Sequence, residues 1–283
     1  RTPEALANLS AALREDVGRH AAEHWHVLQP GPSNGSDGSF EAFLGSLADG
    51  LRARPLGRPS LDFALAELAP QLDTESLWLE FGVWLGHSLN LLGLRAHELG
   101  LQRKVFGFDS FRGLPEDWRH MKGIFSEAWE RRFTLQGAFD LDGHPPDLLV
   151  DTNNVDFVVG WFNESLPAFL ERELGSVSFL HVDSDLHSSA ATVLHHVGPR
   201  LRPGSVIVFD ELINYPGFRG GELLALYEWL ESPEFKRAGH TGLQVIGYPG
   251  PNLLTADAEI KDALRLQGKE GRLYPQDAIF RVW

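Results

Sequence analysis

The sequence contains no cysteine among its 283 residues. This absence excludes disulfide bonds, zinc–thiolate sites and cysteine nucleophiles, and it leaves the redox compartment undetermined. No run of about 18 uninterrupted apolar residues occurs, so we expect neither a transmembrane helix nor a membrane partner. The opening residues, Arg1-Thr2-Pro3, show no signal-peptide pattern. We expect a cytoplasmic protein, whose chain is trimmed, processed or cut from a larger multidomain protein.

Positive charge is also scarce. The chain has 25 lysine and arginine residues against 39 aspartate and glutamate residues, which gives a formal net charge of −14. No stretch is rich in lysine or arginine, so a nucleic-acid partner is disfavoured, because such binding depends on neutralising phosphates. The acidic balance suits an enzyme with a small-molecule substrate, although many proteins carry such a charge for solubility alone.

The N-terminal part, residues 1–72, has a helical pattern and no obvious chemistry. Apolar residues at helical spacing predict helices over residues 4–28, 40–52 and 61–68. A stretch rich in proline, glycine and serine over residues 30–39 predicts a flexible loop between the first two. We expect this part to form a helical cap, which either covers the substrate or provides the surface of a homo-oligomer.

From residue 73 to residue 283, apolar runs that predict buried strands alternate with helical segments. This alternation indicates an α/β fold: a Rossmann-like, mostly parallel, seven-stranded sheet with helices on both faces. The last two strands follow each other without a clear helix, so they are expected to form an antiparallel pair. A long segment, about residues 110–151, connects the second and third strands and predicts a lid-like insertion. The expected strands are 77–81, 105–108, 155–159, 177–181, 205–209, 243–247 and 278–282.

A glycine-containing turn follows the first of these strands, in Glu80-x-Gly82-x-x-x-Gly86. Its glycines let the backbone approach a ligand closely, and Ser88 is placed to cap the next helix, whose N-terminus would face an anionic group. Asp109 ends the second strand, where nucleotide-binding folds use a carboxylate to hold ribose hydroxyls. The turn lacks the third glycine of the dinucleotide fingerprint, which favours a nucleoside ligand without a pyrophosphate. The alternative is that the glycines only permit a tight turn.

Four carboxylates follow the fourth and fifth strands: Asp183, Asp185, Asp210 and Glu211. They should converge, because the carboxyl ends of parallel strands gather at one edge of a sheet. Like charges this close are costly unless some are protonated or a cation lies among them, and oxygen ligands favour Mg²⁺, Ca²⁺ or Mn²⁺. Such an ion would hold a substrate hydroxyl and lower its pKa, while Asp185, or less readily His187, would take the proton. The alternative is that these side chains cap helices or lie exposed.

Two aromatic residues, Trp161 and Phe162, follow the third strand. Aromatic rings often line nucleoside pockets, so these two are candidates to sandwich an adenine. Core packing beneath a turn is an equally good interpretation of either residue.

Together these segments resemble class I S-adenosylmethionine-dependent methyltransferases. Within that class they resemble the metal-dependent macrocin O-methyltransferase family, which acts on sugars of macrolide antibiotics. The order and spacing of the motifs make the resemblance specific, and it spans about residues 75–230. The matching segments are residues 80–86, 108–115, 160–167, 182–186 and 201–211.

The resemblance implies roles for individual residues. Glu80 and Gly82 would line the methionine end of the cofactor, Asp109 would hold the ribose, and Trp161 would border the adenine. With the residues of the glycine turn and its neighbours, the expected cofactor-binding set is Glu80, Gly82, Gly86, Ser88, Asp109, Ser110, Trp161, Phe162 and Asp183.

The same resemblance implies that Asp183, Asp210 and Glu211 bind Mg²⁺. The chain departs from the family at two positions: Glu211 stands where a second aspartate is usual, and His187 where a tyrosine is common. The first departure bears on the geometry of the metal site, and the second on the substrate pocket. The expected catalytic residues are Asp183, Asp185 and His187.

The sequence therefore predicts a Mg²⁺-assisted, S-adenosylmethionine-dependent transfer of a methyl group to the hydroxyl of a sugar or other natural-product intermediate. A nicotinamide-dependent oxidoreductase is one alternative, and the missing third glycine argues against it. A non-catalytic scaffold domain is another, and a costly cluster of carboxylates argues against that.

Overall fold

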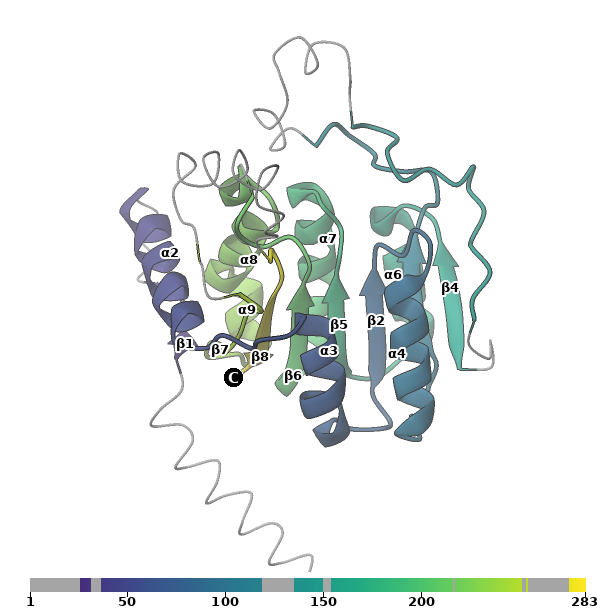
Figure 1. Ribbon diagram of the computed structural model, residues 1–283, viewed down its shortest axis with the longest axis horizontal. Helices are drawn as coiled ribbons and strands as arrows, with labels where there is room; N and C mark the ends of the chain where they lie inside the picture. The colour runs from purple at the N-terminus through teal and green to yellow at the C-terminus, as the bar shows by residue number, and fades with distance from the viewer. Residues whose placement is uncertain are drawn as a thin grey trace, which may run out of the picture.

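A computed structural model describes residues 26–31, 37–118, 135–149, 154–215, 217–250, 253 and 275–283. These residues build one twisted sheet of eight strands with helices packed on both of its faces (Figure 1). The order of strands across the sheet is β1-β7-β8-β6-β5-β2-β3-β4. Within these residues, no helix has both the length and the hydropathy that crossing a bilayer requires.

All seven strands expected from the sequence are present. Five of them run parallel: β2 (Leu77–Phe81), β3 (Val105–Asp109), β4 (Val155–Val159), β5 (Val177–Val182) and β6 (Leu201–Phe209). The expected antiparallel closure is confirmed, because β8 (Ala278–Val282) pairs antiparallel with both β6 and β7 (Leu243–Gly247).

An eighth strand, β1 (Val27–Leu28), adds to this edge by pairing antiparallel with β7. The prediction of a helix over residues 4–28 is therefore wrong at its last three residues, 26–28, because hydrogen bonds to the edge of the sheet compete with local helix formation there. Residues 4–25 of that predicted helix lie outside the described residues.

Helices cover both faces of the sheet, as the alternating pattern predicts. They are α2 (Asp37–Arg52), α3 (Ser60–Phe63), α4 (His87–Glu98), α6 (Phe162–Arg172), α7 (His187–Val197), α8 (Glu222–Glu231) and α9 (Pro233–Arg237). Helix α3 continues through a π-helical turn and a 3₁₀ turn to Gln71. The short α9 follows α8 directly and was not expected; Ser232 caps it by accepting a hydrogen bond from the backbone N–H of Phe235.

Two hydrophobic cores lie on opposite faces of the sheet. One is formed with α2, α6, α7 and α8, and it contains Phe81 and Phe108, whose rings stack with centroids 4.4 Å apart. The other is formed with α4 and residues 60–71, and it contains Trp78 and Phe179. Because side chains alternate along a strand, Leu79 and Phe81 face the first core while Trp78 faces the second.

The described part of residues 1–72 contributes to both cores. Helix α2 packs its buried leucines into the first core, and residues 64–69 belong to the second. This segment therefore shares its hydrophobic contacts with the sheet. The domain boundary predicted at residue 72 stays a prediction.

The topology creates a crevice at the carboxyl edge of the sheet. The chain proceeds outward from β2 through β3 to β4, then returns to β5 on the other side of β2 and continues to β6. Ligands of open α/β sheets bind at such a reversal of strand order. The described parts of the predicted lid lie above this edge (Figure 1). Leu114 and Trp118 of this segment pack against Leu186 in a small separate hydrophobic cluster.

Candidate active site

A cavity of about 820 Å³ opens at this reversal of strand order. The loops after β2, β3, β4, β5 and β6 all contribute to its wall, together with the start of α7 and the described part of the lid. Its lining residues are Gly82, Val83, Trp84, Asp109, Ser110, Gly113, Leu114, Pro115, Phe139, Trp161, Phe162, Asn163, Glu164, Asp183, Ser184, Asp185, Ser188, Ser189, Thr192, Asp210 and Glu211.

The charge of this wall is of one sign. Six lining residues are acidic, and none of the lining residues in the described part of the chain is lysine, arginine or histidine. Apposed carboxylates without counter-charges are unfavourable in a partly buried site. The cavity is therefore suited to a ligand that carries positive charge.

Asp109 is held by the glycine turn. Its Oδ2 atom accepts hydrogen bonds from the backbone N–H groups of Val83 (2.8 Å) and Trp84 (2.9 Å), and its Oδ1 atom accepts one from Phe111 (2.7 Å). These bonds connect the ends of β2 and β3 and fix the carboxylate at the cavity wall. Each carboxylate oxygen has further acceptor capacity for a ligand hydroxyl.

Packing against the backbone requires glycine at position 82, and a positive φ favours it at position 86. Gly82 has φ +91°, and a Cβ atom there would lie 1.6 Å from the backbone oxygen of Asp183. Gly86 has φ +74° and precedes the first turn of α4, where a Cβ atom would lie 2.7 Å from the side chain of Leu148. Gly82 lines the cavity and Gly86 does not.

Glu80 lies behind the cavity wall, fully buried on the α4 side of β2. Ser88, in the first turn of α4, donates a hydrogen bond to its Oε1 atom, so Ser88 holds Glu80 rather than capping the helix. His181, paired in register with Glu80 on the adjacent β5, places its Nδ1 atom 3.8 Å from the same oxygen.

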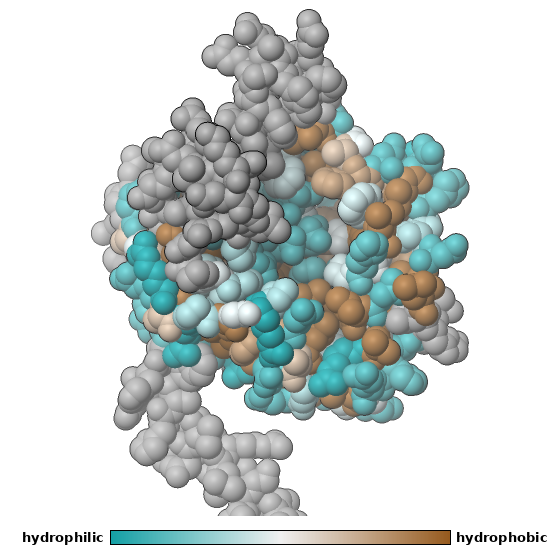
Figure 2. Space-filling view, viewed as in Figure 1, coloured by the Kyte–Doolittle hydropathy of each residue, from teal (hydrophilic) through white to brown (hydrophobic). Residues whose placement is uncertain are grey.

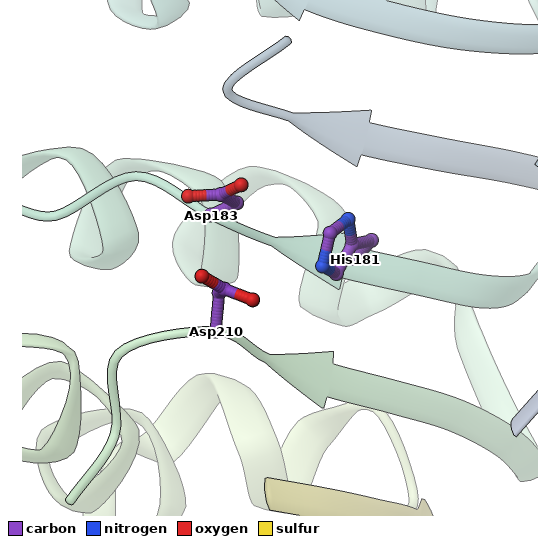
Figure 3. Close-up of side chains that lie close together, drawn as sticks. All are labelled: His181, Asp183 and Asp210. Carbon is purple, nitrogen blue, oxygen red and sulfur yellow. The ribbon is translucent and has the colours of Figure 1, made fainter. Parts of the chain in front are cut away.

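Asp183 and Asp210 face each other across the ends of β5 and β6, with His181 beside them (Figure 3). One ligand atom from each of these three side chains lies within 4.8 Å of the other two, a spacing that could hold a metal ion. Burial, followed by repulsion from Asp210, raises the pKa of Asp183 well above its usual value. The donor set of two carboxylates and an imidazole therefore fits a divalent cation, which would relieve this repulsion.

The other two predicted carboxylates, Asp185 and Glu211, also reach the cavity. Asp185 is buried in a left-handed backbone conformation (φ +60°), which is uncommon for a residue other than glycine. Burial and the nearby Asp210 and Asp109 raise its pKa to about 7. Burial and Asp183 raise the pKa of Glu211 well above its usual value, and its Oε2 atom is buried without a hydrogen-bond partner in the described structure.

A further acid, Glu222, supports the loop between Asp183 and Asp185. It is fully buried at the first residue of α8, and its Oε1 atom accepts hydrogen bonds from the backbone N–H (2.9 Å) and hydroxyl (3.0 Å) of Ser184. Burial raises its pKa to about 8, although the two bonds from Ser184 act in the opposite direction.

The aromatic candidates both line the cavity, with different surroundings. Phe162 packs edge-on against the core residue Phe81, with ring centroids 5.2 Å apart. Trp161 precedes α6 and is half-buried in the wall. On the opposite side, Phe139 of the predicted lid contacts Trp84 of the glycine turn edge to face at 5.3 Å. Met121 and Trp129, in the same predicted lid, lie outside the described residues.

The structure brings most of the predicted site residues to one cavity. Glu80, Gly86 and Ser88 support the wall from behind. His187 stands apart: its Nε2 atom lies 2.7 Å from Glu228 of α8, and it does not line the cavity. The lining residues among the predictions are Gly82, Asp109, Ser110, Trp161, Phe162, Asp183, Asp185, Asp210 and Glu211.

Two residues of the site were not assigned a role from the sequence. His181 stands two positions before Asp183, and the strand alternation places both side chains on one side of β5, a signal that was available. Glu222 has no comparable signal, because its contact with Ser184 depends on how α8 packs against α7 and the sheet.

Comparison with known proteins agrees with this geometry. Residues 79–212 match a family described as a methyltransferase domain. The chain is 31% identical over 144 residues to the 8-demethyl-8-(2,3-dimethoxy-alpha-L-rhamnosyl)-tetracenomycin-C 4'-O-methyltransferase of Streptomyces olivaceus, a match covering 47% of this chain and 51% of that protein. It is also 31% identical over 147 residues to the mycinamicin III 3''-O-methyltransferase of Micromonospora griseorubida, with 47% and 54% covered. The chain thus spans about half the length of the curated relatives it matches.

Among solved structures, a calicheamicin methyltransferase aligns over 99% of this chain and 93% of its own, with 21% identity and a TM-score of 0.46. The family match covers β2 through β6 and the motifs at their carboxyl ends, so residues 79–212 of this chain are similar to a methyltransferase domain.

Proposed function

We propose that this protein transfers the methyl group of S-adenosylmethionine to a hydroxyl of a small molecule, a sugar or another natural-product intermediate, with the help of a divalent cation. The observation that carries the proposal is the single cavity in which the glycine turn, Asp109 and the carboxylates of β5 and β6 meet. S-adenosylmethionine bears a sulfonium and an ammonium group, so an acidic wall is complementary to it.

The cofactor would lie against the loops after β2, β3 and β4. Asp109 accepts bonds from the glycine turn and is available to ribose hydroxyls, and Trp161 is exposed to the cavity for an adenine ring. Glu80, buried beneath this region, contributes negative charge close to the methionine end that the resemblance assigns to it.

The acceptor hydroxyl would approach from the side of Asp185. Methyl transfer is an in-line displacement, so the protein has to align oxygen, methyl and sulfur and take up the proton of the hydroxyl. The pKa of Asp185, raised to about 7, suits a general base near neutral pH. Mg²⁺ or a similar ion, held by Asp183 and Asp210 with Glu211 as the resemblance implies, would orient the hydroxyl and lower its pKa.

The acceptor class follows from the relatives. Their names describe O-methylation of a rhamnosylated tetracenomycin and of mycinamicin III. A glycosylated natural product is therefore the first acceptor to test.

The test combines calorimetric titration with S-adenosylhomocysteine and a transfer assay with labelled S-adenosylmethionine on a panel of glycosides. We expect Asp210→Ala to abolish transfer while leaving S-adenosylhomocysteine affinity within a few fold of wild type. Asp156→Ala is the matched control, because Asp156 is exposed and pairs with Lys104 far from the cavity.

Two results would contradict the proposal in different ways. Full turnover in EDTA by both wild type and Asp210→Ala would remove the metal from the mechanism. Tight binding of NAD without binding of S-adenosylhomocysteine would instead favour the oxidoreductase alternative, and binding of neither would favour a scaffold.

A further inference from the structure

His181 is a buried side chain whose ring nitrogens have no hydrogen-bond partner in the described part of the chain. It is 1% exposed, and neither ring nitrogen makes a hydrogen bond within the described structure. A buried polar group left in this state costs about 1–3 kcal/mol, so native proteins almost always satisfy it. We therefore expect a bound group to contact a ring nitrogen of His181.

The position of the ring indicates what that group is. A ring nitrogen of His181 lies within 4.8 Å of carboxylate oxygens of both Asp183 and Asp210, and Figure 3 shows the ring beside the two carboxylates at the strand ends. Around a divalent ion with ligand distances of about 2.1 Å, adjacent ligand atoms stand about 3 Å apart and opposite ones about 4.2 Å apart. The three groups would have to draw together slightly to bind one ion.

A carboxylate also lies near the other side of the ring, where metal-binding histidines often have one. The Nδ1 atom of His181 lies 3.8 Å from Oε1 of Glu80, which Ser88 holds in place by a hydrogen bond. A histidine that binds a metal through one nitrogen commonly directs its other N–H group to a carboxylate, which sets the tautomer and the ring orientation. Glu80 is placed to do this and leaves Nε2 for the ion.

Among the described residues, His181, Asp183 and Asp210 form a group whose ligand atoms lie close enough together to hold one ion, and Glu211 is not part of this group. The kind of ligand atom determines which metal ion the site prefers. An all-carboxylate site suits Mg²⁺, whereas an imidazole ligand favours the first-row transition ions.

We propose that His181 is a ligand of the divalent ion, through Nε2 and together with Asp183 and Asp210, and that the site therefore prefers Mn²⁺ or another first-row transition ion to Mg²⁺. This inference rests on the metal-assisted part of the proposed function. It differs from the ligand set that the family resemblance implies, in which Glu211 takes the third position.

The test uses Mn²⁺ as the probe on the full chain. Electron spin-echo spectroscopy of bound Mn²⁺ detects a directly coordinated nitrogen, and labelling the protein with ¹⁵N-histidine assigns that nitrogen to an imidazole. We expect a nitrogen coupling that changes with the label, and an affinity for Mn²⁺ at least about tenfold higher than for Mg²⁺ in competition titrations.

Variants identify the histidine. His181→Gln should remove the nitrogen coupling and weaken Mn²⁺ binding at least about tenfold, while His195→Gln, an exposed position on α7, should keep both at wild-type values. Circular dichroism checks that each variant is folded. If His181→Gln fails to fold, the measurement on wild type still tests the proposal, because the absence of an imidazole coupling there overturns it.

Bound Mn²⁺ without nitrogen coupling would overturn the proposal and leave metal-assisted methyl transfer in place. A coupling that survives in folded His181→Gln would overturn it as well. If the protein binds no Mn²⁺, His181 serves only as the partner of Glu80; binding of S-adenosylhomocysteine, measured on the same sample, then shows whether the methyltransferase proposal itself survives.

Discussion

Glu222 is a fully buried acid beside the site, and it has no proposed role in binding the cofactor, the substrate or the metal ion. Its carboxylate accepts two hydrogen bonds from Ser184 and is otherwise surrounded by buried groups, and its pKa is raised to about 8. A raised pKa means that the folded protein binds this proton more tightly than the unfolded chain does. The stability from that proton is complete below the unfolded pKa, near 4.5, and is lost as pH rises to about 8.

We therefore expect the metal-free protein to lose stability between about pH 5 and pH 8, and Glu222→Gln to reduce the slope by an amount on the order of a few kcal/mol over this range. The glutamine keeps an acceptor for Ser184 but has no proton to release. Urea unfolding at a series of pH values measures this. Glu171→Gln, at an exposed position of α6, is the control and should follow wild type; an unchanged slope in Glu222→Gln would contradict the assignment.

Asp109 is fixed at the wall of the predicted cofactor site by backbone hydrogen bonds. Three backbone N–H groups, from Val83, Trp84 and Phe111, donate to its two oxygens. Asp109→Asn replaces one acceptor by a donor that faces an N–H group, which loosens the wall of the cofactor site. The loss of charge-assisted bonds is worth about 1.5–3 kcal/mol, so affinity for S-adenosylhomocysteine should fall by roughly tenfold to a hundredfold. Calorimetry checks this, with Asp156→Asn as the control that leaves the affinity unchanged.

The glycine turn shows how one element constrains another. The backbone of Gly82 passes so close to β5 that a Cβ atom would lie 1.6 Å from the backbone oxygen of Asp183. Gly82→Ala should force β2 and β5 apart exactly where the cavity forms, costing more than about 2 kcal/mol of unfolding free energy. It should also abolish S-adenosylhomocysteine binding.

Gly57→Ala separates the steric clash from backbone strain. Gly57 also has a positive φ (+71°), but nothing lies within 4 Å of an added Cβ atom. The strain alone should cost about 1–2 kcal/mol and leave ligand binding intact. Equal losses of stability and binding in the two variants, measured by thermal unfolding and calorimetry, would show that contact with β5 is not the reason for Gly82.

Helix α2 shares the core of the sheet, so we expect the two to unfold together. Leu44, Leu47 and Leu51 of α2 are buried in the core that also contains α7 and α8. Leu47→Ala should therefore cost about 2–5 kcal/mol in a single cooperative transition that includes the ligand-binding part of the protein. Leu174→Ala is the control, because Leu174 is 65% exposed.

A separate early transition in Leu47→Ala, with the main transition unchanged, would show that α2 is an independent cap. Tryptophan fluorescence, with and without S-adenosylhomocysteine, distinguishes the two results.

Helix α4, unlike α2, leaves two leucines, Leu91 and Leu94, exposed on its outer surface. Figure 2 shows apolar side chains in this region.

The sequence by itself determined the main elements of the sheet and the residues that end its strands. Continuous apolar runs, such as Leu77–Phe81 and Val177–Val182, are typical of strands that are buried on both faces of a sheet. Parallel strands also bring their carboxyl ends to one edge of the sheet. Asp109, Asp183 and Asp210 could therefore be assigned to one site before any contact was known.

Only the tertiary structure decided which side chains touch. It placed His181 next to Asp183 and Asp210, turned His187 away toward Glu228, and brought Glu222 from a later helix under Ser184. It also converted Val27–Leu28 from the end of a predicted helix into an edge strand. These outcomes depend on long-range packing and on distances of a few ångströms, whereas the periodicity of a sequence reports only the face on which each residue lies.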